Sequence, residues 1–185
     1  KFPGGYTVRA EKAPNARGIR RVLEAFGGAT TDAAGFEAAL SAESGPEAVV
    51  LTGNYPSAWV TSSFADVLGD RFVVLIDTMS NQLESRCDVF MSAATWVEKS
   101  GTFENVDGRL QAFERAIEPL DYCKSEAQIA MDLLAVHDGV QADWFNAAMT
   151  RQAMSIESGM KEFLEEVHMP EAQTTVESDM EVIEL

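Results

Sequence analysis

The sequence predicts an α/β fold: an open, mostly parallel sheet flanked by helices, with a β-hairpin and a C-terminal helical extension. Three short apolar runs support this prediction, AVVLTG at 48–53, RFVVLID at 71–77 and DVFMSA at 88–93. Continuous apolar runs are typical of parallel strands that are covered on both faces. Helical segments separate the runs, as right-handed crossover connections require. With 185 residues, 46% of them hydrophobic, the chain is long enough to bury one core.

Two helices are predicted before the first strand. The first begins after Asn15, a favourable capping residue, and ends at the glycine pair 27–28. Its apolar residues recur at helical spacing, at Ile19, Val22, Leu23 and Phe26. The second can be capped by Thr31 or Asp32 and ends at the chain-breaking sequence Ser-Gly-Pro, 44–46. Its inner face would carry Ala33, Phe36 and Leu40.

The connections between the strands are also predicted to be helical. Ser57 can cap a helix that ends at Gly69 and presents apolar side chains at Val60, Phe64, Val67 and Leu68. A short polar helix at 81–86 leads into the third strand. A hairpin at 101–113 follows that strand, and its Asp107-Gly108 pair can supply the positive φ angles of a tight turn.

Beyond the hairpin the chain becomes helical again. Ser125 and Gln128 can form a capping box for a helix whose apolar residues are Ile129, Leu133 and Val136. Further helices are predicted around 144–149 and 156–167. From Pro170 the sequence is acidic and lacks helical periodicity, so we expect a mobile end or one that orders only on a partner.

This organisation predicts four segments. They are a connector at 1–14, an α/β domain at 15–138, a helical extension at 139–169 and an acidic mobile tail at 170–185. Basic residues concentrate near the start of the chain and acidic residues near its end. The acidic end is interpreted either as a solvated tail or as a docking surface for a basic partner subunit.

The composition disfavours several classes of function. A net charge of −16 repels nucleic acid and anionic membrane surfaces, so we expect no nucleic-acid partner. The sequence contains no apolar run near the length of a membrane span and no signal-peptide pattern, so no direct membrane insertion is expected. A cytoplasmic location follows as the expectation.

The cysteines and histidines do not form a recognisable site. Cys87 and Cys123 lack the spacing of a zinc site or an iron–sulfur cluster, and they are interpreted as reduced thiols, although their pairing stays open. His137 and His168 fall in predicted helices, without a nucleophile in a recognisable setting. We therefore expect no metal ligands and no catalytic residues in this chain.

Polar residues follow the strands, where the carboxyl edge of a parallel sheet collects ligands. Gly53, Asn54 and Pro56 follow the first strand, and Asp77 ends the second. As a nucleotide site, Gly53 would allow close backbone approach, and Asp77 could accept two hydrogen bonds from a guanine edge. As ordinary structure, the same residues form a turn and a helix cap. The sequence lacks the glycine-rich motifs of NAD and ATP sites.

The order of these residues resembles the late α/β domain of the molybdopterin oxidoreductase superfamily. The resemblance covers residues 48–135 and rests on AVVLTGNYP, on FVVLIDTMSNQLESRCDVFMSAATWVEKSGTFENVDGRLQ and on a helix around IAMDLLA. Its most specific part is EKSGTFENVDGRLQ at 98–111. The family includes formate dehydrogenases, nitrate reductases and the large iron–sulfur G subunit of respiratory complex I.

The resemblance implies a cofactor cleft at the carboxyl edge. In cofactor-bearing relatives the Asp at the position of Asp77 recognises the guanine of molybdopterin guanine dinucleotide, and the turn of Gly53, Asn54 and Pro56 approaches that cofactor. The hairpin would form a wall of this cleft, so Asp77 and Arg109 should meet at one rim. The implied cofactor-contacting positions, a possible remnant of the cleft, are Gly53, Asn54, Pro56, Asp77, Thr102, Asn105 and Arg109.

The chain also departs from the family pattern. Ser92 stands where relatives have Pro at the third strand, and residues 80–82 replace a Thr-Glu-Thr in the preceding loop. Loss of that proline would change the geometry of the loop and with it the cofactor contact. The chain ends without the final β-rich barrel of most molybdenum and tungsten enzymes, which complex I G subunits commonly lack. The segment PNARG at 14–18 also resembles those subunits.

We therefore expect the C-terminal part of a G-subunit-like protein of NADH-quinone oxidoreductase. It would be a supporting domain in respiratory electron transfer, without its own cofactor or turnover. Iron–sulfur clusters would lie in a missing N-terminal part. Its partners would be other domains of the polypeptide and other subunits, which could hold it peripherally at the inner face of a membrane.

Two alternatives remain. The first is the cofactor-binding domain of a molybdenum or tungsten oxidoreductase such as a formate dehydrogenase, which would bind molybdopterin guanine dinucleotide. The second is a flavodoxin-like receiver with Asp77 as phospho-acceptor. The receiver needs an acidic pair after an earlier strand, where this chain has Thr52 and Gly53.

Overall fold

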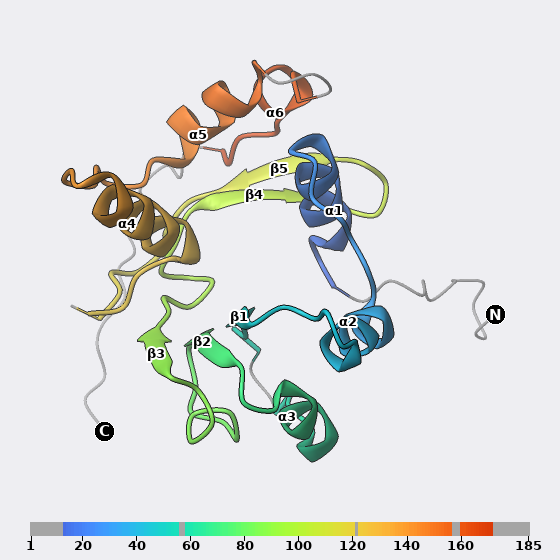
Figure 1. Cartoon of the computed structure of the whole chain (residues 1–185). Coiled ribbons are helices and arrows are strands. Elements are labelled where there is room, and N and C mark those ends of the chain that lie inside the picture. Colours follow the sequence, from blue (N-terminus) through green and yellow to red (C-terminus); the bar gives the residue numbers. More distant parts are fainter. Residues whose placement is uncertain (1–12, 56–57, 121, 157–159, 172–185) are drawn as a thin grey trace, which may run out of the picture.

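The chain forms a three-stranded parallel sheet flanked by helices, then an antiparallel hairpin and further helices, which confirms the predicted α/β fold (Figure 1). The computed structural model describes residues 13–55, 58–120, 122–156 and 160–171. The elements before the hairpin are α1 (Ala16–Ala25), α2 (Ala33–Ser41), β1 (Ala48–Thr52), α3 (Ser62–Leu68), β2 (Phe72–Asp77) and β3 (Val89–Ser92). The hairpin and the helices after it are β4 (Gly101–Glu104), β5 (Leu110–Phe113), α4 (Glu126–Asp138), α5 (Ala147–Met154) and α6 (Glu162–Glu165).

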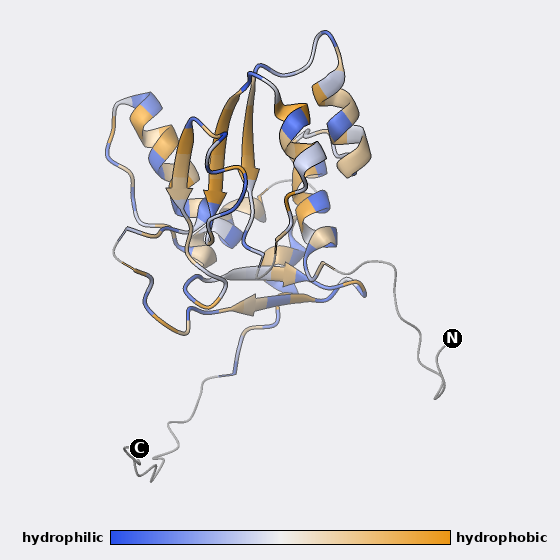
Figure 2. Ribbon diagram, turned by 90° about the horizontal axis from the view of Figure 1, so that it is seen from below, coloured by the Kyte–Doolittle hydropathy of each residue, from blue (hydrophilic) through white to orange (hydrophobic). Residues whose placement is uncertain are grey.

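The three strands of the larger sheet are parallel, as predicted, and lie in the order β1-β2-β3. Leu51 pairs with Leu75, and Asp77 pairs with Ser92, so the carboxyl ends of the strands share one edge. Figure 2 shows the arrowheads pointing toward the hairpin, which runs across beneath them. The sequence of β1, β2 and β3 therefore places its strand-end residues between the sheet and the hairpin.

The predicted hairpin is confirmed as an antiparallel pair of strands, with Thr102 opposite Ala112. Its turn differs in one detail from the prediction. Gly108 has a φ of +82°, whereas Asp107 does not have a positive φ. One glycine in the left-handed region is enough because the Asn105 side chain accepts hydrogen bonds from the backbone N–H groups of Asp107 and Arg109 and closes the turn.

The helix between β1 and β2 begins later than predicted. Ser57 lies outside the described residues, and residues 58–60 are not helical. Thr61 is the cap instead, since its hydroxyl accepts from the backbone N–H of Phe64 at 3.2 Å. The extended segment before Thr61 lets Val60 enter the core, where it is 7% exposed. The free energy gained by burying Val60 therefore exceeds what a helix beginning at the predicted Ser57 cap would provide.

The predicted polar helix at 81–86 is a series of turns. The Asn81 side chain accepts from the backbone N–H of Leu83 at 2.8 Å, which competes with helical hydrogen bonding. Leu83 is fully buried, so the segment folds inward. In the described part of the helix predicted at 156–167, which leaves out 157–159, the helical residues are those of α6. His168 lies in extended chain, where its backbone hydrogen-bonds to Leu110 and Ala112 of β5.

The helix predicted around 144–149 begins after Asn146 instead. The Asn146 side chain accepts from the backbone N–H of Met149 at 3.0 Å and caps α5. Because of this cap, the aromatic pair Trp144 and Phe145 precedes the helix.

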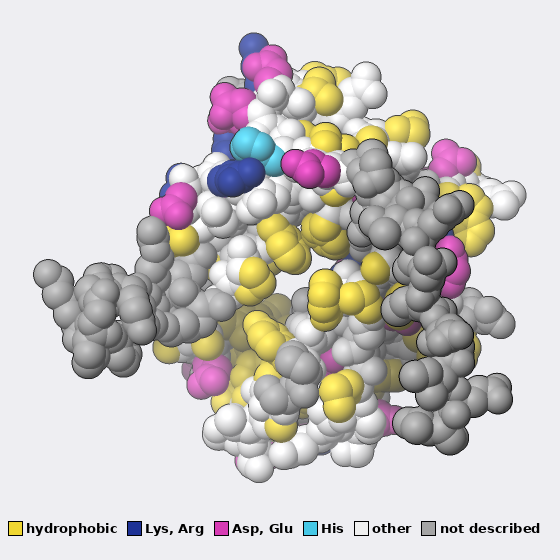
Figure 3. Space-filling model, turned by 180° about the vertical axis from the view of Figure 1, so that it is seen from behind, with side chains coloured by type: hydrophobic (Ala, Val, Ile, Leu, Met, Phe, Trp, Pro, Cys, Tyr) yellow, Lys and Arg dark blue, Asp and Glu magenta, His cyan; other side chains and the backbone are white. Residues whose placement is uncertain are grey.

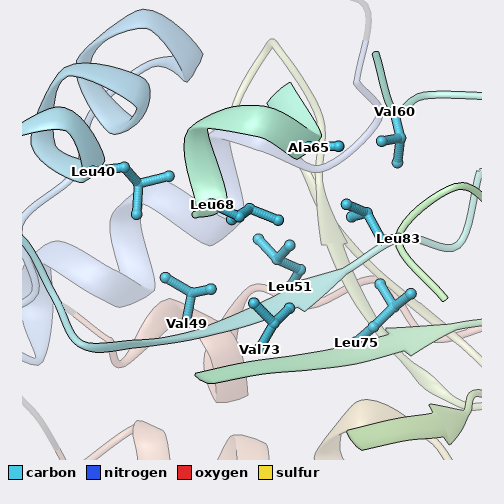
Figure 4. Close-up of a cluster of buried hydrophobic side chains, with 9 residues drawn as sticks. All are labelled: Leu40, Val49, Leu51, Val60, Ala65, Leu68, Val73, Leu75 and Leu83. Carbon is cyan, nitrogen blue, oxygen red and sulfur yellow. The ribbon is translucent and has the colours of Figure 1, made fainter. Parts of the chain in front are cut away.

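The main core lies between one face of the sheet and the helices α2 and α3 (Figure 4). Its buried residues are Leu40, Val49, Leu51, Val60, Ala65, Leu68, Val73, Leu75 and Leu83. On the other face, α4 contributes Ile129 to a smaller cluster with Ile76 and Ala93. This cover does not reach β1, where Val50 is 62% exposed. The prediction that every strand is covered on both faces is therefore wrong for β1.

Arg71 joins the ends of α2 and α3 beneath this core. Its guanidinium donates to the carbonyl oxygens of Val67 and Leu68 at 3.2 and 3.0 Å, and also to that of Leu40. Its Nε donates to the carbonyl oxygen of Pro46 at 2.8 Å. Carbonyl groups at helix ends lack partners within the helix, so one cation satisfies both helices.

Shortening a fully buried strand residue should strongly destabilise the fold. Leu75 is 0% exposed, and we expect Leu75→Ala to lower the free energy of unfolding by about 3 kcal/mol, because it leaves a cavity. Val50→Ala, on the exposed face of β1, is the matched control and should change that free energy by less than about 0.5 kcal/mol. Urea denaturation of both variants measures the difference. Equal losses would contradict the one-sided core.

Candidate functional site

A buried carboxylate lies at the carboxyl edge of the parallel sheet. Asp77 is the last residue of β2 and is only 2% exposed. It is held between the turn after β1, the extended segment before α3 and the loop after β2. A buried charge needs partners, and the sequence supplies them from all three segments.

The two oxygens of Asp77 accept hydrogen bonds from four close donors. Oδ1 accepts from the backbone N–H groups of Asn54 at 2.9 Å and Thr78 at 2.7 Å. Oδ2 accepts from the indole Nε1 of Trp59 at 3.0 Å and from Nδ2 of Asn81 at 2.8 Å. A carboxylate offers about four acceptor positions. The acceptor capacity of Asp77 is therefore used within the chain, and the Met79 N–H, at 3.4 Å from Oδ1, adds a weaker contact.

The hydrogen bonds also set the ionisation of Asp77. Burial by itself would raise the pKa of this carboxyl. The N–H groups of Asn54, Trp59, Thr78 and Met79 stabilise the charged form and outweigh burial, so the pKa lies below its usual value. Asp77 is consequently an ionised structural anion at neutral pH.

Gly53 is required by Asp77 itself. A Cβ at position 53 would lie 1.9 Å from Oδ2 of Asp77, which no side chain can tolerate. The sequence suggested that this glycine allows a cofactor to approach the backbone. In the structure, the space left by the missing side chain is filled by the Asp77 carboxylate. The next residue, Asn54, has a φ of +68°, and this turn aims its N–H at Oδ1.

A pocket of about 210 Å³ lies next to Asp77. Its walls include Tyr55 and Met79, both about half exposed, together with Trp59 and Asn81. The Trp59 ring lies between aromatic neighbours, with ring centroids 6.3 Å from Tyr55 and 6.2 Å from Phe64. The pocket is open at its rim, but Trp59 and Asn81 already bond to the carboxylate at its base.

A second network ties this edge to the hairpin side. The Asn54 side-chain amide donates to Glu126, the first residue of α4. Lys99, just before β4, donates to both carboxylate oxygens of Glu126, at 2.9 and 2.7 Å. A carboxylate in the first turn of a helix is also favoured by the helix dipole. The oxygen of the Asn54 amide is buried and has no hydrogen-bond partner among the residues the structure describes.

The hairpin residues singled out in the sequence lie elsewhere. Thr102 accepts from Arg151 of α5 at 3.3 Å, and Asn105 closes the hairpin turn. Arg109 lines a separate cavity of about 590 Å³, which shares no residue with the pocket of Asp77. Gly53, Asn54 and Asp77 are thus brought together, Thr102, Asn105 and Arg109 are not, and Pro56 lies outside the described residues.

A buried glutamate organises the cavity of Arg109. The side chain of Glu104 is 1% exposed and accepts from Arg17 at 2.8 Å and Arg21 at 3.5 Å. Its backbone N–H donates to the Asn15 side chain at 2.8 Å. Arg21 also pairs with Glu162 of α6. These contacts fix α1 and α6 to the hairpin, so Arg17 and Arg21, two of the cations that line this cavity, already serve as structural partners.

Two important residues are not indicated by local sequence patterns. Trp59 was assigned to a helix, and its position three residues after Pro56, the last residue of the strand-end turn, was the only signal of a role at the edge. Glu104 lies 87 positions from Arg17, so no local pattern could indicate their ion pair. Both residues act through long-range contacts that periodicity does not encode.

The two cysteines are free thiols, as expected. Burial raises the pKa of Cys87, and burial together with the charge of Glu98 raises that of Cys123. Thiols with raised pKa values are poor nucleophiles at neutral pH. The residues described here also contain no group of three or more His, Cys, Asp or Glu that could hold a metal ion.

Comparison with known proteins gives two matches. The model of the family described as "Molybdopterin oxidoreductase" matches residues 20–136, well over half of the chain. A nitrate reductase from Symbiobacterium thermophilum is 29% identical over 66 residues. That alignment covers 36% of this chain and 9% of the nitrate reductase, so the chain spans only a small part of that relative.

Neutralising Asp77 should destabilise the fold. Asp77→Asn would place an amide N–H₂ among N–H donors, and we expect a loss of about 3 kcal/mol in the free energy of unfolding at pH 7. Asp66→Asn is the control, because Asp66 is largely exposed in its pair with Arg86 and should cost less than about 1 kcal/mol. Urea denaturation compares them. A loss for Asp77→Asn no larger than the control's would contradict the structural role.

The lowered pKa of Asp77 also predicts a pH dependence. A carboxyl whose pKa is lower in the folded chain stabilises the fold fully above its unfolded pKa of about 3.9. That contribution is lost as the pH falls through the folded pKa. We therefore expect the stability gap between the wild type and Asp77→Asn to be constant from about pH 7 to 5 and to shrink below about pH 4. A gap that widens on acidification would refute the assignment.

Proposed function

Because this chain belongs to the molybdopterin oxidoreductase family, we propose that it is the supporting α/β domain of a G-subunit-like protein of NADH-quinone oxidoreductase. In this role the domain positions its neighbours in an electron-transfer chain and carries out no turnover of its own. Iron–sulfur clusters would be held by other parts of the polypeptide. The activity of the whole protein belongs to this proposal, since the matched segment is a small part of its nitrate reductase relative.

The saturated carboxylate of Asp77 is the observation on which the proposal rests. In cofactor-bearing relatives, the resemblance implies an aspartate at this position that accepts hydrogen bonds from guanine. Here four donors of the chain fill the acceptor positions of Asp77, and the side chain is 2% exposed. The guanine of a molybdopterin dinucleotide does not fit an edge that is closed in this way. Such an edge is consistent with a remnant cleft whose residues now stabilise the fold.

The exposed apolar surface supports a role inside a larger assembly. Val136 of α4 is 78% exposed and Trp144 is 85% exposed. Other large apolar side chains also stay exposed, among them Leu120, Tyr122, Leu133, Leu134 and Val140. Seen from behind, hydrophobic side chains gather around a hollow in the middle of the molecule (Figure 3). Extensive exposed apolar surface is typical of contact with other domains or subunits.

The location follows from the same proposal. Among the described residues, none of the helices has both the length and the apolar character needed to cross a bilayer. Contact with partner subunits would then hold the domain at the inner face of a membrane. The net charge of −16 disfavours direct binding to anionic lipids, so this attachment would run through protein contacts.

The second candidate is a cofactor-binding domain of a molybdenum or tungsten oxidoreductase. The alignment with the nitrate reductase favours it, because that relative is named as an enzyme. In this case residues other than Asp77 would have to hold the molybdopterin guanine dinucleotide, because donors of the chain already fill the acceptor positions of Asp77.

Metal analysis of the complete gene product distinguishes the two functions. The protein should be purified without oxygen from cells supplied with molybdate and tungstate. The supporting-domain proposal predicts iron without stoichiometric molybdenum or tungsten. Either metal in an amount equal to the protein would overturn it in favour of the enzyme. A known molybdenum enzyme purified in parallel controls for loss of the metal.

A further inference from the structure

Trp59 and Asn81 donate to Oδ2 of Asp77 with two N–H groups, one from a ring and one from an amide. A guanine edge would offer the same kind of donor pair, a ring N–H and an amino group. We propose that the side chains of Trp59 and Asn81 occupy the place of the guanine base and so close the guanine site from within. We call this pair of side chains the plug. This inference rests on the proposed function, since it names the residues that make the site a remnant.

The ring of Trp59 suits this role in shape as well as in hydrogen bonding. Indole and purine are both flat fused bicycles with a polar edge. The ring is held between Tyr55 and Phe64 and packs against the main core, so its N–H is fixed toward Oδ2 at 3.0 Å. An indole held in this manner loses little entropy in keeping its hydrogen bond.

Asn81 is oriented just as firmly. Its side-chain oxygen accepts from the backbone N–H of Leu83, and its Nδ2 donates to Asp77 at 2.8 Å. Leu83 is fully buried, so the turn that carries Asn81 is anchored in the core. Both donors to Oδ2 are therefore set in place before any ligand arrives.

Trp59 lines the pocket beside Asp77 and at the same time bonds to the carboxylate, which an ordinary hydrogen bond within the core would not do. Tyr55 and Met79, which line the pocket beside Asp77, are each 53% exposed, whereas Asp77 itself is 2% exposed. Among the residues that line the pocket, Trp59 and Asn81 are the ones whose side chains donate to the carboxylate. Removing the indole would expose one acceptor position of Asp77 at the base of an enlarged pocket.

The test is rescue of Trp59→Gly by small ligands, with binding followed by isothermal titration and thermal unfolding. We expect the wild type to show no saturable binding of GMP at millimolar concentration. Trp59→Gly should melt at lower temperature, and indole should restore part of the loss by refilling the space. GMP should bind the variant at least about tenfold more tightly than AMP, because AMP lacks the ring N–H of guanine. Adding Asp77→Asn to the variant should abolish that preference.

Trp59→Phe is the matched second variant, since it retains an apolar ring and removes only the N–H. We expect it to fold and not to bind GMP, because the ring still fills the space. GMP binding by Trp59→Phe equal to that of Trp59→Gly would overturn the plug, as would a folded Trp59→Gly with no preference for GMP over AMP. If Trp59→Gly does not fold, hydrogen exchange of the Trp59 indole in the wild type decides. Protection that excess GMP leaves unchanged supports the closed site, and loss of protection refutes it.

These results separate the two proposals. Saturable, Asp77-dependent binding of GMP to the wild type would refute both the plug and the remnant cleft. If the wild type does not bind GMP and folded Trp59→Gly shows no preference for GMP over AMP, only the plug is refuted. The supporting-domain proposal is then decided by the metal analysis of the complete gene product. Molybdenum or tungsten in the complete protein, with no GMP binding by the wild type, would refute only the supporting domain.

Discussion

The arrangement of this domain depends on one buried carboxylate. Asp77 ends the central strand and accepts hydrogen bonds from the turn after β1, the segment before α3 and the loop after β2. Gly53 gives it room, and the positive φ of Asn54 turns a backbone N–H toward it. Because an unpaired charge is costly in a protein interior, these segments are fixed to one another as a unit. The hydrogen bonds to Asp77 therefore both hold these segments in place and fill the acceptor positions at the edge of the sheet.

A second buried acid has a similar role at the hairpin. Glu104 accepts from Arg17 and Arg21 of α1, and Arg21 continues to Glu162 and lies over the ring of Phe163, 5.3 Å from its centroid. Beneath these charges, Leu110, Met160 and Phe163 form a small core. The hairpin is thus fastened to both ends of the described chain by a mixture of ion pairs and apolar packing. A chain of polar contacts connects the two layers of the domain, the hairpin and the parallel sheet. It runs from Lys99 through Glu126 to Asn54 at the edge of the sheet.

The sheet edge and the exposed apolar surface both fit the proposed role as a supporting domain. The strands still deliver polar residues to a shared carboxyl edge, as in ligand-binding α/β proteins. The polar residues at that edge now bond to one another, and Trp59 and Asn81 complete the acceptor set of Asp77. At the same time, α4 and the segment before α5 keep large apolar side chains at the surface. The polar groups at this edge are therefore used within the chain, and the exposed apolar surface is suited to packing against neighbours.

The sequence by itself determined the architecture. The apolar runs of β1, β2 and β3, the helix cap at Ser125 and the turn at Gly108 each encode local structure, and the parallel sheet, the hairpin and α4 appear where they were expected. The Gln128 side chain, which the predicted capping box would turn back to Ser125, bonds instead to Asp132, Asp143 and Phe145. Periodicity and turn chemistry are local signals, so they can be read along the chain. Tertiary structure alone decided the rest, including the extended path of Trp59, the inward fold of Leu83 and the separation of Arg109 from Asp77. Those features depend on contacts between segments that are distant in sequence, such as the hydrogen bonds from buried donors to Asp77. These contacts form only when the segments pack together.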